Sequence, residues 1–205
     1  VLSPVEAELA KLFTNSWRYI QFAVANQFYM IATSYNLDFY KIFDAMKYKY
    51  PRARDFPSSG FAAGPCLFKD TMQVAAFNNN SFFLGHAAML VNEGMPNYIV
   101  QRLKTAHDLK TKTVGILGMA FKANNDDKRE SLSYKLRKIL NVEAKQVCCS
   151  DVYIQEPGFM EPQRLIAECD IVILAAPHRE YADLQIPAGK LTVDIWNFFG
   201  KGGMF

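Results

Sequence analysis

The chain has 205 residues, of which 50% are hydrophobic and 21% are charged. At roughly 100–200 residues per domain, this length allows one large or two small domains, and the composition excludes a chain that is disordered throughout. The net charge is +3, from 23 basic and 20 acidic residues. So small an excess excludes a nucleic-acid-binding protein that acts through bulk charge, while it leaves room for a local anion site.

The lengths of the apolar runs and the pattern of cysteines indicate in which cellular compartment the protein is expected. No apolar run reaches the roughly 18 residues of a membrane helix, and the N-terminus lacks the basic and apolar regions of a signal peptide. The 4 cysteines include no CxxC pair, and Cys148 and Cys149 are adjacent, which suits neither a zinc site nor a disulfide framework. We therefore expect a cytoplasmic protein with no membrane insertion, no nucleic-acid partner and no bound metal.

A long helix is predicted over residues 4–35, with Ser3 as its N-cap and Pro4 in its first turn. Large apolar residues recur in it at spacings of three and four: Leu9, Leu12, Phe13, Trp17, Ile20, Val24, Phe28 and Ile31. A second stripe, about 60° wide at 100° per residue, carries polar side chains: Glu8, Lys11, Asn15 and Asn26. Such a stripe is usually a solvated face, but a helix that is apolar almost all round is usually buried. We therefore expect this stripe to line a cleft or an interface.

Further helices are predicted before residue 105. One covers residues 36–50, and its inward-facing residues are expected to be Leu37, Ile42, Phe43 and Met46. A loop rich in proline and glycine follows over residues 51–65. Helical periodicity resumes over residues 66–78 and 82–104. Residues 1–108 are thus predicted to form an all-helical domain with a long first helix.

After a charged linker near residues 105–112, the pattern changes to short strands that alternate with helices. The strands are expected at 113–117, 146–150, 171–175 and 191–195, and the helices between them at 131–140 and 161–168. This alternation is typical of a doubly wound parallel sheet. Residues 109–205 are therefore predicted to form a Rossmann-like α/β domain, which makes the fold class α plus α/β.

A first candidate site lies in the glycine-containing block Gly60–Asp70. Glycines let backbone approach a ligand closely, and Pro65 suits the first position of a helix. Cys66 would then stand at that helix N-terminus, where the macrodipole favours a thiolate, with Lys69 and Asp70 within about one turn. A nucleophile, a cation and a carboxylate this close suit catalysis, although the spacing alone favours a packed cysteine. The remaining cysteines are predicted to be core residues: Cys148, Cys149 and Cys169.

A second candidate site lies after the first predicted strand, in residues 115–131. Anions bind at such strand-to-helix turns, and three basic residues cluster here: Lys122, Lys128 and Arg129. The dinucleotide fingerprint GxGxxG is absent, because only Gly115 and Gly118 occur. The cluster is either a phosphate cradle or a solvated charge run before a helix capped by Ser131 or Asp127. Asp151, at the end of the second strand, is a weak candidate for a ribose-binding acid.

Blocks in one order along the chain carry a family resemblance: Ala7–Lys11 with Asn15 and Asn26, Gly60–Asp70, Phe121–Ser131, and Val193–Asp194. With them, the chain resembles the central and C-terminal domains of the UDP-glucose/GDP-mannose dehydrogenase family, the nucleotide-sugar 6-dehydrogenases. The family's N-terminal NAD-binding domain, which carries GxGxxG, is expected to precede Val1. On this resemblance the chain is a fragment of an enzyme.

The resemblance implies an NAD-dependent oxidoreductase that takes the C6 alcohol of a UDP-hexose (UDP-glucose or a UDP-N-acetylhexosamine) to the uronic acid. It implies that Cys66 is the nucleophile of a thiohemiacetal and a thioester, assisted by Lys11, Asn15 and Asp70. The residues that it implies for the substrate are Phe61, Lys122, Arg129 and Arg52, and Lys69 would face the cofactor. It also implies a homodimer built by the long first helix.

Some residues depart from the family's pattern. Tyr50-Pro51-Arg52 and Pro177-His178 look more like the branch that oxidises UDP-N-acetylhexosamines, and Trp196 stands where the family often has an arginine. Arg52 would reach a neighbouring subunit's site or be merely solvated, and His178 would contact a ligand or only cap a strand end.

Two other functions are considered. A non-catalytic nucleotide-sugar-binding or dimerisation module would need none of Lys11, Asn15, Cys66 and Asp70. A cysteine hydrolase lacks a histidine partner, because His86 lies in a predicted helix among apolar residues and is expected to be core.

Overall fold

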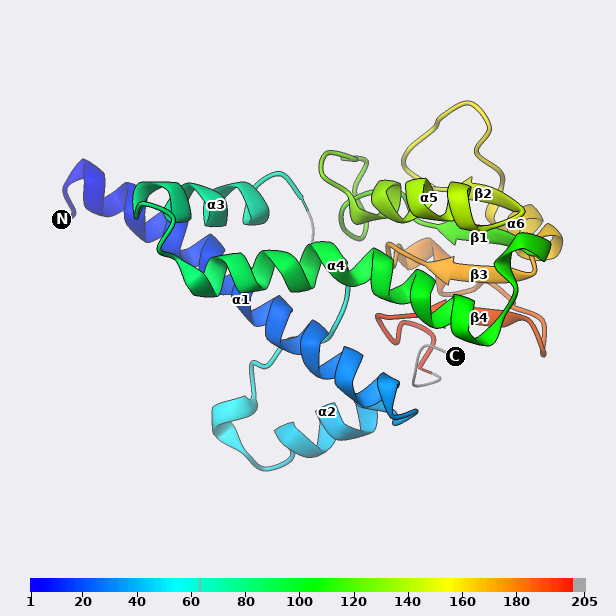
Figure 1. Ribbon diagram of the computed structural model, residues 1–205, viewed down its shortest axis with the longest axis horizontal. Coiled ribbons are helices and arrows are strands. Elements are labelled where there is room, and N and C mark those ends of the chain that lie inside the picture. Colours follow the sequence, from blue (N-terminus) through cyan, green and yellow to red (C-terminus); the bar gives the residue numbers. More distant parts are fainter. Residues whose placement is uncertain (63, 201–205) are drawn as a thin grey trace.

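The computed structural model describes residues 1–62 and 64–200, and it consists of a helical part followed by a parallel sheet with helices, as predicted (Figure 1). The helical part contains α1 (Pro4–Ser34), α2 (Phe39–Lys47), the 3₁₀ turn η1 (Pro51–Ala53), α3 (Leu67–Phe77) and α4 (Phe83–Ala106). The sheet part contains η2 (Leu109–Thr111), β1 (Thr113–Leu117), α5 (Leu132–Glu143), β2 (Gln146–Ser150), α6 (Pro162–Glu168), β3 (Ile171–Leu174), η3 (Arg179–Tyr181) and β4 (Leu191–Asp194). No helix in the described residues is both long and apolar enough to cross a membrane.

α1 begins where the sequence predicts. Ser3 Oγ accepts the Glu6 amide, and the Glu6 carboxylate accepts the Ser3 amide, which forms a capping box with Pro4 in the first turn. The large apolar side chains of α1, however, are not all buried in this chain. Five large apolar residues are 39–60% exposed: Phe13, Trp17, Val24, Phe28 and Ile31. The side that α1 turns toward α3 and α4 carries small, polar and tyrosine residues instead. Periodicity reveals that a stripe is apolar but not which partner covers it, so the sequence alone did not determine which side of α1 is buried.

α2 is shorter than predicted, and its inward face differs. Leu37 and Ile42 are exposed, whereas Phe39 and Tyr40 are buried at the start of the helix. Asp38 sets this register because its carboxylate accepts the amides of Tyr40 and Lys41 as an N-cap. The helix therefore starts after Leu37 rather than before it.

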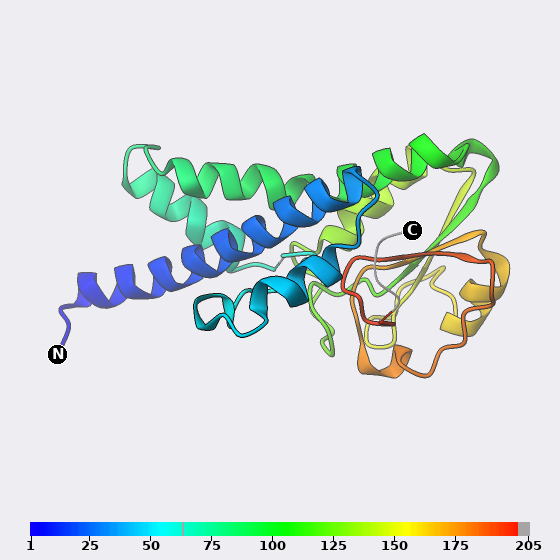
Figure 2. The same ribbon diagram turned by 90° about the horizontal axis from the view of Figure 1, so that it is seen from below.

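The sheet is parallel with strand order β2-β1-β3-β4, so the predicted doubly wound sheet is confirmed. Alternate strand residues pack on opposite faces: Ile171 and Ile173 lie in a core shared with α4 and α5, and Val172 and Leu174 lie in a core shared with α6. Figure 2 shows α4 and α5 on one side of the strands and α6 on the other.

α4 joins the two parts of the molecule. Its first half packs on α1 and α3, and its second half packs on α5 and carries the fully buried Met95, Ile99 and Leu103. These three side chains belong to the same core as Tyr29 of α1 and Ile116 of β1. The helical part and the sheet part therefore share one continuous core, although their sequence patterns differ.

A chain of buried side-chain amides holds the glycine loop, residues 57–65, against the helices. Asn26 of α1 accepts the Gly60 amide at 2.9 Å and donates to Asn92 of α4 at 2.9 Å. Asn92 in turn donates to the carbonyl of Tyr19 at 2.9 Å. Both asparagines are fully buried, so each polar atom depends on these partners for hydrogen bonding.

Replacing Asn26 by leucine is expected to destabilise the fold. The change leaves the Gly60 amide and an Asn92 oxygen buried without partners, at a cost of roughly 1–3 kcal/mol for each group. Urea unfolding of Asn26→Leu should therefore show a loss of several times that of Gln27→Leu, which changes the exposed neighbour on the same helix. Equal stability of the two variants would contradict the bracing role of Asn26.

Candidate active site

The end of β4 fastens onto the glycine loop. Ser59 Oγ donates to the Ile195 carbonyl at 2.8 Å, and the Tyr40 hydroxyl donates to the same oxygen. All of these groups are buried. Because the carbonyl belongs to the residue before Trp196, the two hydrogen bonds also fix where the tryptophan emerges from the sheet.

Aromatic rings from the sheet part press on two glycines of this loop. A Cβ on Gly60 would lie 2.3 Å from the Trp196 ring, and one on Gly64, whose φ is +106°, would lie 2.6 Å from the Phe121 ring. No larger residue fits either place without displacing a ring. The glycines therefore serve the close approach of two protein segments, and this seam lies immediately before Cys66.

Cys66 is the N-cap residue of α3 and is exposed. The prediction that it stands at a helix N-terminus is confirmed, but Pro65 precedes the cap instead of occupying the first helical position. The predicted core cysteines are buried: Cys148, Cys149 and Cys169. Burial raises the pKa of Cys149 to about 11, so the accessible thiol of this chain is that of Cys66.

Asp70 lies one turn after Cys66, and its side chain is only 1% exposed. Its Oδ2 accepts Lys11 Nζ at 2.5 Å and Asn15 Nδ2 at 2.6 Å, and Lys69 Nζ lies 3.6 Å from Oδ1. Burial alone would raise the pKa of Asp70, but the hydrogen bonds from Lys11 and Asn15 outweigh it and lower the pKa. The carboxylate therefore stays ionised at neutral pH.

Lys11 gains the reciprocal effect. Its hydrogen bond to Asp70 raises the lysine pKa, and the charge of Asp70 adds a smaller contribution in the same direction. Lys11 is therefore a fixed ammonium and a hydrogen-bond donor, not a base. The expectation that the polar stripe of α1 lines a cleft or an interface is met only in part. Lys11 and Asn15 contact Asp70 of α3 and Asn26 contacts the glycine loop. Glu8 and Lys11 are exposed, and none of the four lines the cavity between the helical part and the sheet part.

A cavity of about 470 Å³ opens between the helical part and the sheet part. Its lining comes from α1, the glycine loop, the start of α3 and the carboxyl edge of the sheet: Arg18, Phe22, Phe61, Ala62, Gly64, Pro65, Cys66, Leu67, Phe121, Lys122, Ala123, Asp127, Arg129, Pro177 and Trp196. Four predicted site residues thus meet in one cavity from two distant stretches of sequence. They are Phe61, Cys66, Lys122 and Arg129.

Other predicted site residues lie outside the lining. Lys11, Asn15 and Asp70 form their cluster beside the cavity, with Lys69 on the exposed side of α3. Arg52 lies in η1 and is exposed. This chain does not bring Arg52 to its own cavity. His86 of α4 is half-buried and lies outside the lining.

The basic cluster after β1 is divided among different partners. Arg129 forms a two-pronged ion pair with Asp127, with a shortest N–O distance of 2.7 Å, and lowers the pKa of Asp127 to about 2. Lys128 pairs with Glu156 at 2.6 Å. Lys122 instead packs its ammonium 5.4 Å from the centroid of the Phe121 ring, inside the cavity lining. Of the three basic residues, Lys122 is the one with no ion pair to a carboxylate among the described residues, although its charge helps to lower the pKa of Asp127.

Arg18 and Trp196 line the cavity without having been assigned to a site from sequence. Arg18 follows Lys11 and Asn15 by seven and three positions, which places the three on one helix face, and this spacing was the available signal. Trp196 donates its indole N–H to the Ala175 carbonyl at 3.1 Å and rests on Gly60, which no local pattern reveals.

Asp151 does not serve a ribose. Its buried carboxylate accepts the amides of Met119, Ala120, Tyr153 and Ile154 and contacts a ring nitrogen of His178, so no acceptor position faces solvent. His178 is fully buried and lies outside the cavity lining, so it contacts no ligand there. Ser131, not Asp127, is the N-cap of α5.

Both parts of the chain are similar to known proteins. Residues 5–93 match the central domain of the UDP-glucose/GDP-mannose dehydrogenase family, and residues 115–201 match that family's UDP binding domain. The chain belongs to this family. Both halves that meet at the cavity are thereby accounted for, one as the central domain and the other as the UDP binding domain.

Individual family members are similar over about half their own length. A UDP-N-acetyl-D-mannosamine dehydrogenase of Methanocaldococcus jannaschii is 29% identical over 183 residues, which are 87% of this chain and 42% of that protein. The structure of a UDP-glucose dehydrogenase from Pyrobaculum islandicum superposes with a TM-score of 0.81 at 30% identity, over 95% of this chain and 48% of that one. A UDP-N-acetyl-mannosamine dehydrogenase from Staphylococcus aureus gives 0.79 at 25% identity, over 94% and 47%.

The Asp70 cluster predicts a pH dependence of stability. Because the folded pKa of Asp70 lies below its ordinary value of 3.8, the stability it contributes is present above that value and is lost as the pH falls through the lower folded pKa. Asp70→Asn should therefore lower the free energy of unfolding at pH 7 and flatten its fall below about pH 4. Chemical denaturation across pH measures this, with Asp44→Asn on the exposed side of α2 as the control; a fall as steep as that of the unsubstituted chain would contradict the assignment.

Proposed function

We propose that the chain binds a UDP-linked hexose in the cavity between the central domain and the UDP binding domain, with the C6 end of the sugar toward Cys66. The observation that carries the proposal is the meeting of Cys66 and Phe61 with Lys122 and Arg129 in one cavity. A diphosphate needs cations at one end of the site, and C6 chemistry needs a nucleophile at the other. The nucleotide end is assigned to Lys122, with Arg18 and Arg129 as further guanidinium donors.

The sugar end uses the Asp70 cluster. The Cys66 sulfur adds to the carbon of a C6 aldehyde, which forms a C–S bond and leaves negative charge on the C6 oxygen. The Lys11 ammonium, held charged by Asp70, stabilises that oxygen or donates a proton to it. Asn15 donates to Asp70 in this structure, so it supports the cluster and its own contact with the oxygen stays a prediction.

NAD is the hydride acceptor that we propose for the whole protein. The described residues do not fit a dinucleotide: the turn after β1 lacks GxGxxG, and the acid at the end of β2 is occupied by backbone amides and His178. The roles assigned to this chain are therefore confined to the sugar nucleotide, and the cofactor-facing role of Lys69 stays a prediction. The domains at 1–108 and 109–205 are likewise proposed, with a cytoplasmic location that suits the free thiols.

Two branches of substrate are open to the cavity. By their names, one relative is a UDP-N-acetyl-D-mannosamine dehydrogenase and another is an NDP-N-acetyl-D-galactosaminuronic acid dehydrogenase, and a structural relative is a UDP-glucose dehydrogenase. Trp196 supplies an aromatic face in place of a guanidinium, which favours stacking over a second salt bridge at that position. We propose the UDP-N-acetylhexosamine branch, with a non-catalytic sugar-nucleotide module as the alternative. The exposed Cys66 beside charged Lys11 favours the enzyme over that module.

The rate at which Cys66 is alkylated can be used to measure binding of a ligand in the cavity. Since the other thiols are buried, iodoacetamide should label Cys66 first, as read by mass spectrometry. UDP-N-acetylhexosamine at ten times its Kd is expected to slow this labelling about tenfold, because only the free form reacts. Lys122→Ala should raise that Kd about tenfold through the loss of a charge-assisted hydrogen bond, so the same UDP-sugar concentration should slow labelling only about twofold.

The matched control is Lys145→Ala, an exposed lysine before β2 at the opposite edge of the sheet. It is expected to leave the protection unchanged. Labelling of Cys66 that is indifferent to UDP-sugar at millimolar concentration would overturn the proposed site.

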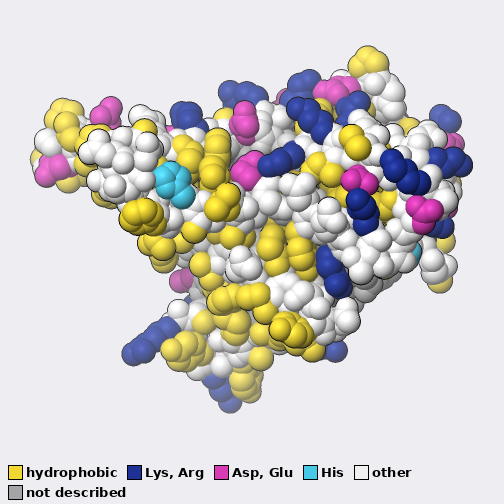
Figure 3. All heavy atoms as spheres, in the orientation of Figure 1, with side chains coloured by type: hydrophobic (Ala, Val, Ile, Leu, Met, Phe, Trp, Pro, Cys, Tyr) yellow, Lys and Arg dark blue, Asp and Glu magenta, His cyan; other side chains and the backbone are white. Residues whose placement is uncertain are grey.

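The exposed apolar side of α1 favours a homodimer. Phe13 and Trp17 on this side are exposed. They also line a groove of about 490 Å³, together with Phe77 of α3 and Phe82 before α4. On the face of the molecule drawn in Figure 3, hydrophobic side chains gather over the helical part, while charged ones are more frequent over the sheet part. Contiguous apolar surface of this extent marks an interface. We propose that a second copy of the chain covers it.

Trp17→Glu is expected to convert the dimer to monomer, because it places a charge in the apolar interface. Sedimentation equilibrium should show a dissociation constant at least tenfold higher, the equivalent of ~1.4 kcal/mol. Val142→Glu, at an exposed apolar position on α5, serves as the control. A monomeric unsubstituted chain at high concentration would contradict the proposal.

A further inference from the structure

We propose that His178 and Asp151 are positioning residues that hold segment 119–124 in place and thereby set how Lys122 meets the nucleotide. Segment 119–124 follows β1 and carries Phe121 and Lys122, which both line the cavity. The inference rests on the proposed sugar-nucleotide site and adds the residues on which that site's geometry depends.

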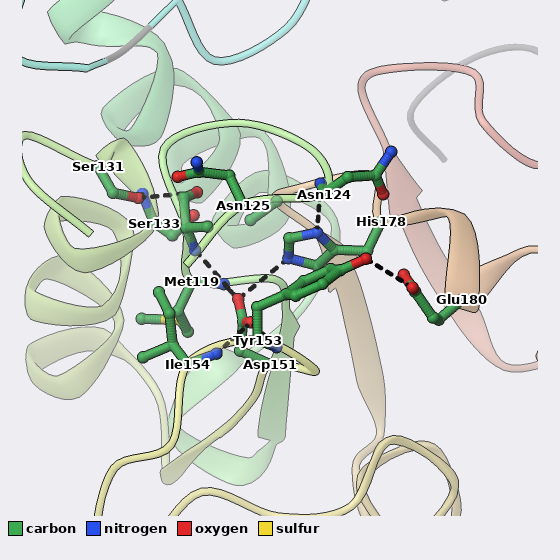
Figure 4. Close-up of polar contacts among 12 residues, drawn as sticks. Met119, Asn124, Asn125, Ser131, Ser133, Asp151, Tyr153, Ile154, His178 and Glu180 are labelled. Carbon is green, nitrogen blue, oxygen red and sulfur yellow. Dashed lines mark hydrogen bonds and ion pairs between the residues drawn. The ribbon is translucent and has the colours of Figure 1, made fainter. Parts of the chain in front are cut away.

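His178 holds the far end of the segment. The Asn124 amide donates to His178 Nδ1 at 2.9 Å, so the neutral ring carries its proton on Nε2, which lies 3.1 Å from Asp151 Oδ2. The ring is fully buried and packs edge-on against Tyr153 and Tyr181. Figure 4 shows the imidazole between the Asn124 backbone and the Asp151 carboxylate. Such a ring has one orientation available to it.

Asp151 holds the near end. Its Oδ2 accepts the amides of Met119 at 2.5 Å and Ala120 at 3.1 Å, and its Oδ1 accepts those of Tyr153 and Ile154. Burial raises the pKa of this carboxyl, yet the hydrogen bonds from His178 and the amides lower it below its ordinary value. An ionised carboxylate, both of whose oxygens accept hydrogen bonds, therefore links the ends of β1 and β2.

The segment between these two anchors is short. Phe121 and Lys122 lie between amides bound by Asp151 and the amide bound by His178, and Asn124 has a positive φ of 54°. The Asn124 side chain also accepts the Arg179 amide at 2.9 Å, which ties the same residue to the start of η3. The ring of Phe121 can press on Gly64 only while the segment keeps this path. The anchors thus position both Lys122 and the wall of the cavity beside Cys66.

Two substitutions of His178 separate its hydrogen bonds. His178→Asn places an acceptor near the position of Nδ1 and retains the bond from the Asn124 amide, whereas His178→Gln retains a donor toward Asp151 and loses that acceptor. Calorimetric titration with UDP should show about tenfold weaker binding for His178→Gln and less than about threefold for His178→Asn. His107→Gln, at the end of α4 by the opposite edge of the sheet, should bind like the unsubstituted chain.

A double-variant cycle tests whether His178 acts through Lys122. If it does, His178→Gln combined with Lys122→Ala should bind UDP no more than about twofold more weakly than Lys122→Ala alone. Multiplicative losses would overturn the inference, because His178 would then act on binding by another route. Thermal unfolding of each variant accompanies the titrations, and rescue by His178→Asn distinguishes positioning from a general loss of structure.

Hydrogen exchange gives a readout that needs no ligand. His178→Gln should speed exchange of the amides of residues 119–124 at least tenfold while those of β1 and β3 keep their protection. Unchanged exchange in the segment would overturn the inference whatever UDP does. If the segment loosens but the unsubstituted chain does not bind UDP, the proposed site fails and the positioning of the segment stands.

Discussion

The position of the glycine loop on the sheet part depends on the close approach of two aromatic rings to two glycines. Trp196 and Phe121 come from separate strand ends of the sheet, and each occupies the space where a side chain on the glycine loop would be. The contact is possible only because Gly60 and Gly64 have no Cβ. This contact places the start of α3, and therefore Cys66, at the cavity beside the UDP binding domain.

Buried polar groups keep that seam in register. Asn26 and Asn92 satisfy the loop from the helical side, and Tyr40 with Ser59 satisfies the end of β4. Apolar contacts alone would allow the helical part and the sheet part to shift relative to each other. A shift that breaks these hydrogen bonds leaves a buried polar group without a partner, which costs free energy. The buried carboxylates of Asp70 and Asp151, which lie outside the cavity lining, are held in the same way: Asp70 accepts hydrogen bonds from side chains, and Asp151 accepts them from backbone amides.

α4 explains why the two parts behave as one body at the cavity. A single helix contributes to the packing of α1 and α3 and then to the core of the sheet, so the cavity walls are connected by continuous backbone as well as by contacts. The apolar side of α1 is left outside this core. Its composition suits burial, and the proposed second copy accounts for a helix that is apolar on faces the chain itself does not cover.

The sequence by itself determined the elements, the parallel sheet and the family. Periods of 3.6 and 2 residues and capping residues such as Ser3 and Ser131 are local, so the strands were predicted to within one residue. The sequence blocks around Lys11, Cys66 and Lys122 could also be recognised as candidate sites, but their proximity in space could not be predicted. Only the tertiary structure decided which side of α1 is buried, that Asp151 and His178 serve the backbone, and that Arg18 and Trp196 reach the cavity. Those facts depend on which surfaces meet across distant stretches of chain, and periodicity carries no information about the partner.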